Sequence, residues 1–270
     1  MSALARRRAG PRLDRATGRP SRAAAEPHRR ARRMISHPHR CVFVHVPKTA
    51  GQSIERVFLD LLGLNWKQRG ELLLRYNADP SLGPPRLAHL CAADYVRCGH
   101  LSESRFADYF SFSFVRNPWD RTVSFYKYIG EPARCEFKRF ALEVLPRDLW
   151  QGMYWFVRPQ TEYLYDNGRL MVDFVGRFER LESDFREICR RLELPCARLP
   201  FVNRSDGTRR QLLAGARHIL RALDPCSPAF GNFRGRPLSR HARFEDYYDD
   251  ETWQAVAALY RPDVETFGYR

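Results

Sequence analysis

The chain has 270 residues, 44% of them hydrophobic and 13% aromatic, which is enough for one large folded domain or two small ones. Its net charge is +15, of which residues 1–33 carry +9, because that stretch holds eleven arginines and two acidic residues. No stretch approaches the roughly 18 apolar residues of a membrane span, and no N-terminal apolar segment marks a secretory signal, so we expect a cytoplasmic protein without a transmembrane segment.

Residues 1–33 are rich in Arg, Ala, Pro and Gly and show no apolar periodicity, which predicts a disordered tail. A nucleic-acid-binding arm or a transit peptide would have a similar composition. The alternative that we favour is that Met34 is the true start and that the tail is dispensable or not native. The predicted folded domain is therefore 34–270.

Two strand–loop–helix units follow along the chain. The first has an apolar run over residues 41–46, a turn over 47–51 and an amphipathic helical pattern over 53–62. The second has a strand over 112–115 and a helix over about 119–129. Asn117 is a good N-cap for this helix, and Pro118 suits its first position.

A third unit is predicted from a strand over 172–178 and a helix through about 194. Strands that alternate with helices indicate an α/β fold with a mainly parallel sheet. Residues 195–240 are rich in Arg, Pro and Gly, with a short helical run near 210–223, and we expect an insertion at about 204–239. A last helix is predicted over about 250–260.

The seven cysteines form no closely spaced pairs, and no histidine pair completes a zinc site. We expect reduced thiols and no bound metal.

The segment between the first strand and its helix has the features of an anion-binding loop. Backbone N–H groups are unpaired at a helix start, and the helix dipole favours negative charge there. The segment departs from the Walker pattern, because its lysine precedes the glycine and the leading glycine is missing. A plain turn with a solvated lysine remains the alternative. The residues concerned are Pro47, Lys48, Thr49, Ala50, Gly51, Gln52 and Ser53.

A second anion site is predicted after the second strand. Arg116 ends that strand, and Ser124 lies about two helical turns beyond Asn117 on the same face. A phosphate beside this helix would accept hydrogen bonds from both side chains. The alternative is that Arg116 pairs with Asp120 and Ser124 is neutral. Two anion sites at neighbouring strand ends suit a ligand with two separate phosphates.

These segments resemble the PAPS-dependent sulfotransferases of the carbohydrate type, the group of heparan sulfate 2-O-sulfotransferase and its bacterial relatives. Phe43–Ser53 resembles the 5′-phosphosulfate loop of that family, and Phe112–Tyr126 resembles its 3′-phosphate motif. Val175–Phe185 and the ending Asp263–Tyr269 resemble later blocks of the bacterial members. The resemblance implies a P-loop-like α/β sandwich.

The resemblance also implies roles and a co-substrate. PAPS, 3′-phosphoadenylyl sulfate, would donate a sulfuryl group to a hydroxyl of a glycan or glycolipid, with no metal. Lys48 would stabilise the leaving phosphate, and the loop from Pro47 to Ser53 would hold the 5′-phosphate. Arg116 and Ser124 would bind the 3′-phosphate.

Attack by an alcohol needs a base, and a neutral histidine suits this near pH 7. Family members carry such a histidine between the two phosphate motifs. His89 and His100 both fit; we favour His89, in a segment over 86–90 that reads as a short strand. His45 lies in the strand before the loop and is expected to be structural.

The acceptor cannot be read from the sequence. Several aromatic residues between 150 and 165 suggest a core with some acceptor contacts, and Arg158 and Gln160 lie within reach of them. Two other functions stay open. One is a kinase with an atypical P-loop, and the other is a non-enzymatic nucleic-acid-binding protein, although the folded part lacks a basic helix for that role.

Overall fold

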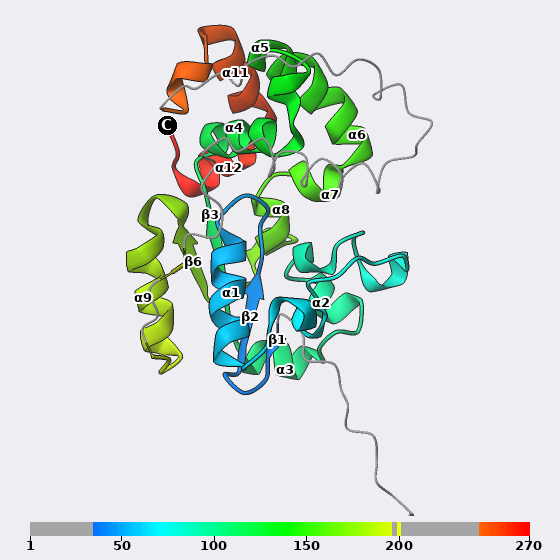
Figure 1. Cartoon of the computed structure of the whole chain (residues 1–270), viewed down its shortest axis with the longest axis vertical. Helices are drawn as coiled ribbons and strands as arrows, with labels where there is room; N and C mark the ends of the chain where they lie inside the picture. The colour runs from blue at the N-terminus through cyan, green and yellow to red at the C-terminus, as the bar shows by residue number, and fades with distance from the viewer. Residues whose placement is uncertain (1–34, 196–198, 201–242) are drawn as a thin grey trace, which may run out of the picture. The chain divides into compact units, whose positions relative to one another are not determined.

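A computed structural model describes residues 35–195, 199–200 and 243–270 (Figure 1). The Arg-rich stretch 1–33, the expected insertion at 204–239 and the helical run at 210–223 lie outside the described residues. No described helix is long and apolar enough to cross a membrane. The five described cysteines are free thiols.

A four-stranded sheet forms the centre of the described fold, in the order β1-β2-β3-β6. The strands are β1 (Ile35–Ser36), β2 (Cys41–Val44), β3 (Phe110–Val115) and β6 (Phe174–Arg177). β2, β3 and β6 are parallel, with Phe43 opposite Phe112 and Phe112 opposite Phe174, while β1 is a short antiparallel edge. The predicted α/β class with a mainly parallel sheet is confirmed.

Both faces of the sheet are covered, and this explains the unusual composition of β3. Its sequence alternates Phe and Ser, yet both serines are buried, as are Phe112 and Phe114. The hydroxyl of Ser113 donates to the Val44 carbonyl at 2.6 Å, and that of Ser111 donates to Asp173 at 2.8 Å. A buried hydroxyl is tolerated when it is hydrogen-bonded, so polar residues can occupy this central strand.

Helices follow the strands as expected. α1 (Gly51–Leu61) begins two residues earlier than predicted, and α4 (Pro118–Ile129) follows β3. The Asn117 side chain caps α4 by accepting from the N–H groups of Trp119 and Asp120, which confirms the predicted cap. Figure 1 shows α1 along the sheet and α4 at the end where β3 finishes.

The third strand and the helix after it are both shorter than the sequence predicted. β6 occupies four residues, a 3-10 turn follows over Phe178–Arg180, and α9 runs over Leu181–Arg191. The C-terminal helix is predicted correctly as α11 (Asp250–Leu259), and a further helix, α12 (Arg261–Phe267), comes after it.

The predicted short strand over residues 86–90 is wrong. Leu87–His89 form a 3-10 turn, closed by a hydrogen bond of 3.0 Å from the His89 N–H to the Arg86 carbonyl. The turn lets Leu87 and Leu90 both be fully buried. A strand would have sent alternate side chains to opposite faces.

Short elements complete the described chain. The helices are α2 (Asp94–Arg97), α3 (Glu103–Asp108), α5 (Phe137–Arg139), α6 (Trp150–Gly152), α7 (Tyr154–Val157) and α8 (Thr161–Leu164). A π-helical stretch over Phe140–Leu149 joins α5 to α6, and 3-10 turns cover Trp66–Leu72, Pro80–Leu82, Glu131–Ala133 and Glu245–Tyr247. β4 (Tyr165–Asp166) and β5 (Arg169–Leu170) form a separate antiparallel pair.

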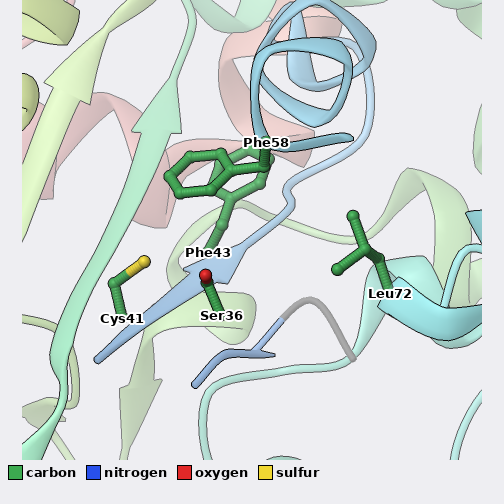
Figure 2. Close-up of a pocket in the computed structure, with 5 residues that line it drawn as sticks. All are labelled: Ser36, Cys41, Phe43, Phe58 and Leu72. Carbon is green, nitrogen blue, oxygen red and sulfur yellow. The ribbon is translucent and has the colours of Figure 1, made fainter. Parts of the chain in front are cut away.

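A small apolar pocket lies at the beginning of β2, lined by Ser36, Cys41, Phe43, Phe58 and Leu72 (Figure 2). It is at the opposite end of the strand from the loop before α1, so it does not belong to the predicted anion site.

Candidate active site

The loop between β2 and α1 adopts the backbone geometry of an anion cradle. Lys48 and Ala50 have positive φ angles of 70° and 67°, and Thr49 between them does not. Alternation of this kind turns successive N–H groups toward one side, as in phosphate-binding loops. Among the described residues, no protein acceptor takes the N–H groups of residues 48–51.

Side chains hold the carbonyl groups of this loop on its other side. Four consecutive carbonyl oxygens accept hydrogen bonds: His45 from His89 Nδ1 at 3.0 Å, Val46 from Thr49 Oγ1 at 2.8 Å, Pro47 from Arg121 Nε at 3.1 Å and Lys48 from Arg116 Nη1 at 3.1 Å. Because a peptide carbonyl and the N–H of the next residue point in opposite directions, the fixed Pro47 and Lys48 carbonyls direct the N–H groups of Lys48 and Thr49 away from these side chains. The loop is therefore preorganised for an anion before one binds.

Thr49 and Gly51 do not play the roles in this loop that their residue types suggest. The Thr49 hydroxyl is buried and donates to the Val46 carbonyl, so what Thr49 offers to an anion is its N–H. A Cβ on Gly51 would overlap the imidazole of His45, so this glycine makes room for a buried ring beneath the loop. Ser53 and Gln52 are half-buried at the start of α1.

Lys48 is the cation of the loop. Its ammonium lies 4.0 Å from the centre of the Tyr128 ring on α4. Burial, followed by the positive charge of Arg116, lowers the pKa of the Lys48 amine from 10.5 to about 7. A bound anion would supply the missing negative charge and restore the protonated form.

Arg116 lies beside this loop, so the two predicted anion sites are adjacent. Its guanidinium donates from Nη1 to the Lys48 carbonyl and binds both oxygens of Asp120 at 2.7 Å from Nε and Nη2. The ring of Phe178 covers one face of the guanidinium at 4.0 Å. The Asp120 pair considered from sequence is present, yet one N–H on each terminal nitrogen is not used by these bonds.

Ser124 lies on the helix face that the loop covers. Asp120, Ser124 and Tyr128 follow one another at intervals of four residues, so they share one side of α4. Asp120 contacts Arg116, and Tyr128 contacts the Lys48 ammonium, which puts Ser124 between them. Its half-buried hydroxyl makes no hydrogen bond with any described residue.

His89 is buried next to the loop in a defined tautomer. A carbonyl oxygen can only accept, so the bond to the His45 carbonyl places the His89 proton on Nδ1 and leaves a lone pair on Nε2. Burial, then the neighbouring His45, lowers the pKa of His89 well below its usual range, and the charges of Arg86 and Arg121 add to this effect. His89 is therefore neutral and basic at Nε2 near pH 7.

His100 has a different environment. Its Nε2 donates to the Leu82 carbonyl at 2.7 Å, in the segment that precedes α2. That bond joins two peripheral segments and does not involve the loop. Of the two candidate histidines, His89 and not His100 lies against the loop.

A buried pair lies beneath the loop. His45 Nδ1 is 2.6 Å from Glu55 Oε1 on α1, and the His45 ring makes an edge contact with the His89 ring at 4.5 Å between centres. Both side chains of the pair are inaccessible to solvent, in agreement with a structural role for His45.

Gln160 is a structural residue and not an acceptor contact. It is fully buried, and its amide pairs with both backbone groups of Arg116, accepting from the N–H at 2.9 Å and donating to the carbonyl at 2.8 Å. The Gln160 N–H donates in turn to the buried Asp263 on α12. These bonds fix the end of β3, and only the structure reveals them, because the partners are far apart in sequence.

Comparison with known proteins identifies the family. A sulfotransferase family matches residues 32–270 of the chain. The chain belongs to the sulfotransferase family. It is accordingly a transferase of the PAPS-dependent class, which excludes a purely nucleic-acid-binding protein and argues against a kinase.

One relative among curated proteins is an uncharacterized protein of Archaeoglobus fulgidus. It is 30% identical over 93 residues, which are 33% of this chain and 72% of the relative. No solved structure matches the chain significantly.

Arg121 is the main residue of this sulfotransferase site that sequence reasoning missed. It is 1% exposed on α4 and holds the Pro47 carbonyl of the loop. Arg121 lies within the second motif, but nothing in the neighbouring sequence shows that an arginine of this amphipathic helix is buried.

Proposed function

We propose that this sulfotransferase moves a sulfuryl group from PAPS to a hydroxyl of a carbohydrate or glycoconjugate, as a member of the group that includes heparan sulfate 2-O-sulfotransferase. The observation that carries the proposal is the set of N–H groups at residues 48–51, which no acceptor among the described residues takes, in a loop whose carbonyl groups from His45 to Lys48 are held toward the protein. Such a cradle fits the 5′-phosphate end of the donor.

Lys48 and Arg116 complete the donor site. The donor supplies a sulfuryl group carried on an oxygen of its 5′-phosphate. Lys48 neutralises the charge that develops on that oxygen as the bond to sulfur breaks. Arg116, held by Asp120, presents its remaining N–H groups to the 3′-phosphate together with the Ser124 hydroxyl.

His89 acts on the acceptor. Nε2 takes the proton of the acceptor hydroxyl as its oxygen bonds to sulfur, and the bond from sulfur to the phosphate oxygen breaks on the opposite side. Nδ1 stays bonded to the His45 carbonyl and keeps the ring in place. The sulfate ester and 3′,5′-ADP leave, and His89 returns its proton to water.

An acceptor screen with radiolabelled PAPS tests the proposal. We expect label on at least one saccharide or glycolipid, and Lys48→Met should abolish the transfer. Lys127→Met is the matched control, because Lys127 also lies over a tyrosine, Tyr247 at 5.0 Å, but on α4 away from the loop. Label only on acceptors without sugars would refute the carbohydrate assignment, and no transfer from PAPS to any acceptor would refute the function.

A further inference from the structure

Arg121 is a buried cation without a carboxylate partner among the described residues. It is one of the largest fully buried side chains, at 1% exposure, and its guanidinium lies against the rings of Phe125 at 4.7 Å and Tyr260 at 5.8 Å. The charge of Arg121 acts on the nearby Asp263, but no carboxylate oxygen of Asp263 comes within 4.0 Å of a guanidinium nitrogen. Asp263 accepts instead from Gln160 and Thr161.

The guanidinium bridges two segments that are far apart in sequence. Nε donates to the Pro47 carbonyl at 3.1 Å, and Nη1 donates to the Arg158 carbonyl at 3.0 Å. Pro47 belongs to the anion-binding loop, and Arg158 directly follows α7, whose Trp155 ring lies 6.0 Å from the ring of His89. One rigid fork therefore joins the loop to the segment beside the base.

Stability alone does not account for such a residue. Nη2 is buried and has no hydrogen-bond partner in the described part of the chain, which is unfavourable for a charged donor. A buried ion pair can often be replaced by apolar side chains of similar volume without loss of stability, so a buried charge is weak evidence for a stabilising role. The loop, in contrast, needs support, because Lys48 and Ala50 occupy left-handed conformations that are costly for residues other than glycine.

We infer that Arg121 is a positioning residue for nucleotide binding, which holds the loop in its cradle conformation from inside the protein. It fixes the Pro47 carbonyl between the carbonyl groups held by Thr49 and Arg116. Its second bond keeps the loop in register with the segment beside His89. The inference rests on the proposed donor site, because it assigns Arg121 to the same loop.

Arg121→Met in the full chain tests the inference with three measurements. We expect only a small change in the thermal midpoint without nucleotide, because removal of the buried charge offsets the loss of the hydrogen bonds to the Pro47 and Arg158 carbonyls. We expect affinity for 3′,5′-ADP to fall about tenfold, because the loop loses a hydrogen bond that orders it. We also expect faster hydrogen exchange of the Ser53 N–H, which donates to the Ala50 carbonyl at 2.9 Å within the loop turn.

Tyr260→Phe is the matched control. Tyr260 packs on the same guanidinium, and its hydroxyl donates to the Val157 carbonyl and not to the loop. This variant should lower the thermal midpoint but leave the affinity and the Ser53 exchange unchanged. Arg121→Lys is a second test, because an amine cannot span both carbonyl groups, and it should also weaken nucleotide binding.

Wild-type affinity and wild-type Ser53 exchange in Arg121→Met would overturn the inference. Failure of both Arg121 variants to fold would also overturn it, since the side chain would then serve the whole core. If the wild-type protein does not bind 3′,5′-ADP, the proposed donor site is refuted, and the exchange of the Ser53 N–H still decides whether Arg121 orders the loop.

Discussion

At the scale of single residues, two groups of the site have protonation states that suit opposite tasks. The buried His89 is kept neutral, with its lone pair on Nε2, so it can accept a proton. In the proposed transfer Lys48 acts as a cation, yet burial lowers its pKa to about 7 in the absence of a ligand. The site is thus ready to take up a proton when an anion arrives.

Nucleotide binding should therefore take up a proton at Lys48. At pH 8 the free amine is mostly neutral, and a bound phosphate raises its pKa, so calorimetry in buffers of different ionisation enthalpy should show uptake of up to about one proton per 3′,5′-ADP. Lys48→Met should bind without this uptake. Equal proton uptake by the two proteins would contradict the assignment.

The same shift makes the stability of the free protein depend on pH. Between about pH 7 and the ordinary value of 10.5, the unfolded chain binds more protons at Lys48 than the folded protein does, so stability rises with pH across this window. Below about pH 7 the full penalty of burying the charge is present. Lys48→Met should remove this part of the pH dependence, which denaturant unfolding at several pH values would measure.

Replacement of His89 with asparagine separates its two roles. The asparagine amide can keep the bond to the His45 carbonyl, but it lacks a basic nitrogen at the position of Nε2. We expect His89→Asn to lower turnover by about 10² to 10⁴ while affinity for 3′,5′-ADP is retained. Full activity in His89→Asn together with loss of activity in His100→Asn would transfer the role to His100.

At the scale of elements, the unit of β2, loop and α1 depends on the close contact between Gly51 in the loop and the His45 ring beneath it. The His45 ring occupies the space in which a side chain at residue 51 would lie. It also stacks on Phe43 at 5.4 Å and contacts Glu55 on α1. Strand, loop and helix are thus packed around one imidazole.

Gly51→Ala should destabilise the protein by about 1–3 kcal/mol, because overpacking forces the ring or the backbone to move. The double variant with His45→Ala should recover part of this loss, since the space of the ring is then free. Denaturant unfolding of the four proteins gives the coupling energy. Additive effects of the two substitutions would show that the glycine serves another purpose.

Sequence reasoning succeeded for these elements where the controlling contacts are local. The Asn117 cap and the two strand–loop–helix units depend on neighbours within a few residues, and they are confirmed. The 3-10 turn at His89 was missed because a short apolar run ending in a histidine also fits a strand, although the turn is closed locally by the His89 N–H and the Arg86 carbonyl. The bond from the His89 ring to the His45 carbonyl, 44 residues away, was missed because no local pattern marks it. The bridge made by Arg121 was missed for the same reason.

At the scale of the whole described fold, parallel pairing of β2 and β3 brings the two motifs together. Their carboxyl ends meet at one edge of the sheet, where Arg116 bonds directly to the Lys48 carbonyl. The C-terminal helix α12 supports this edge through Asp263 and Gln160. β2, near the start of the described residues, and α12, near their end, therefore both hold the loop and Arg116 in place.

The affinity for 3′,5′-ADP compared with that for 5′-AMP and Mg-ATP tests the central claim most directly. We predict that the wild-type protein prefers 3′,5′-ADP, and that Arg116→Ala lowers its affinity for 3′,5′-ADP by about tenfold to a hundredfold and that for 5′-AMP by a smaller factor, because Arg116 also holds the Lys48 carbonyl of the loop. Arg97→Ala, which removes an arginine paired with Asp166 in an exposed ion pair, should change neither affinity. A wild-type protein that binds 5′-AMP as tightly as 3′,5′-ADP, or that prefers Mg-ATP, would contradict the account.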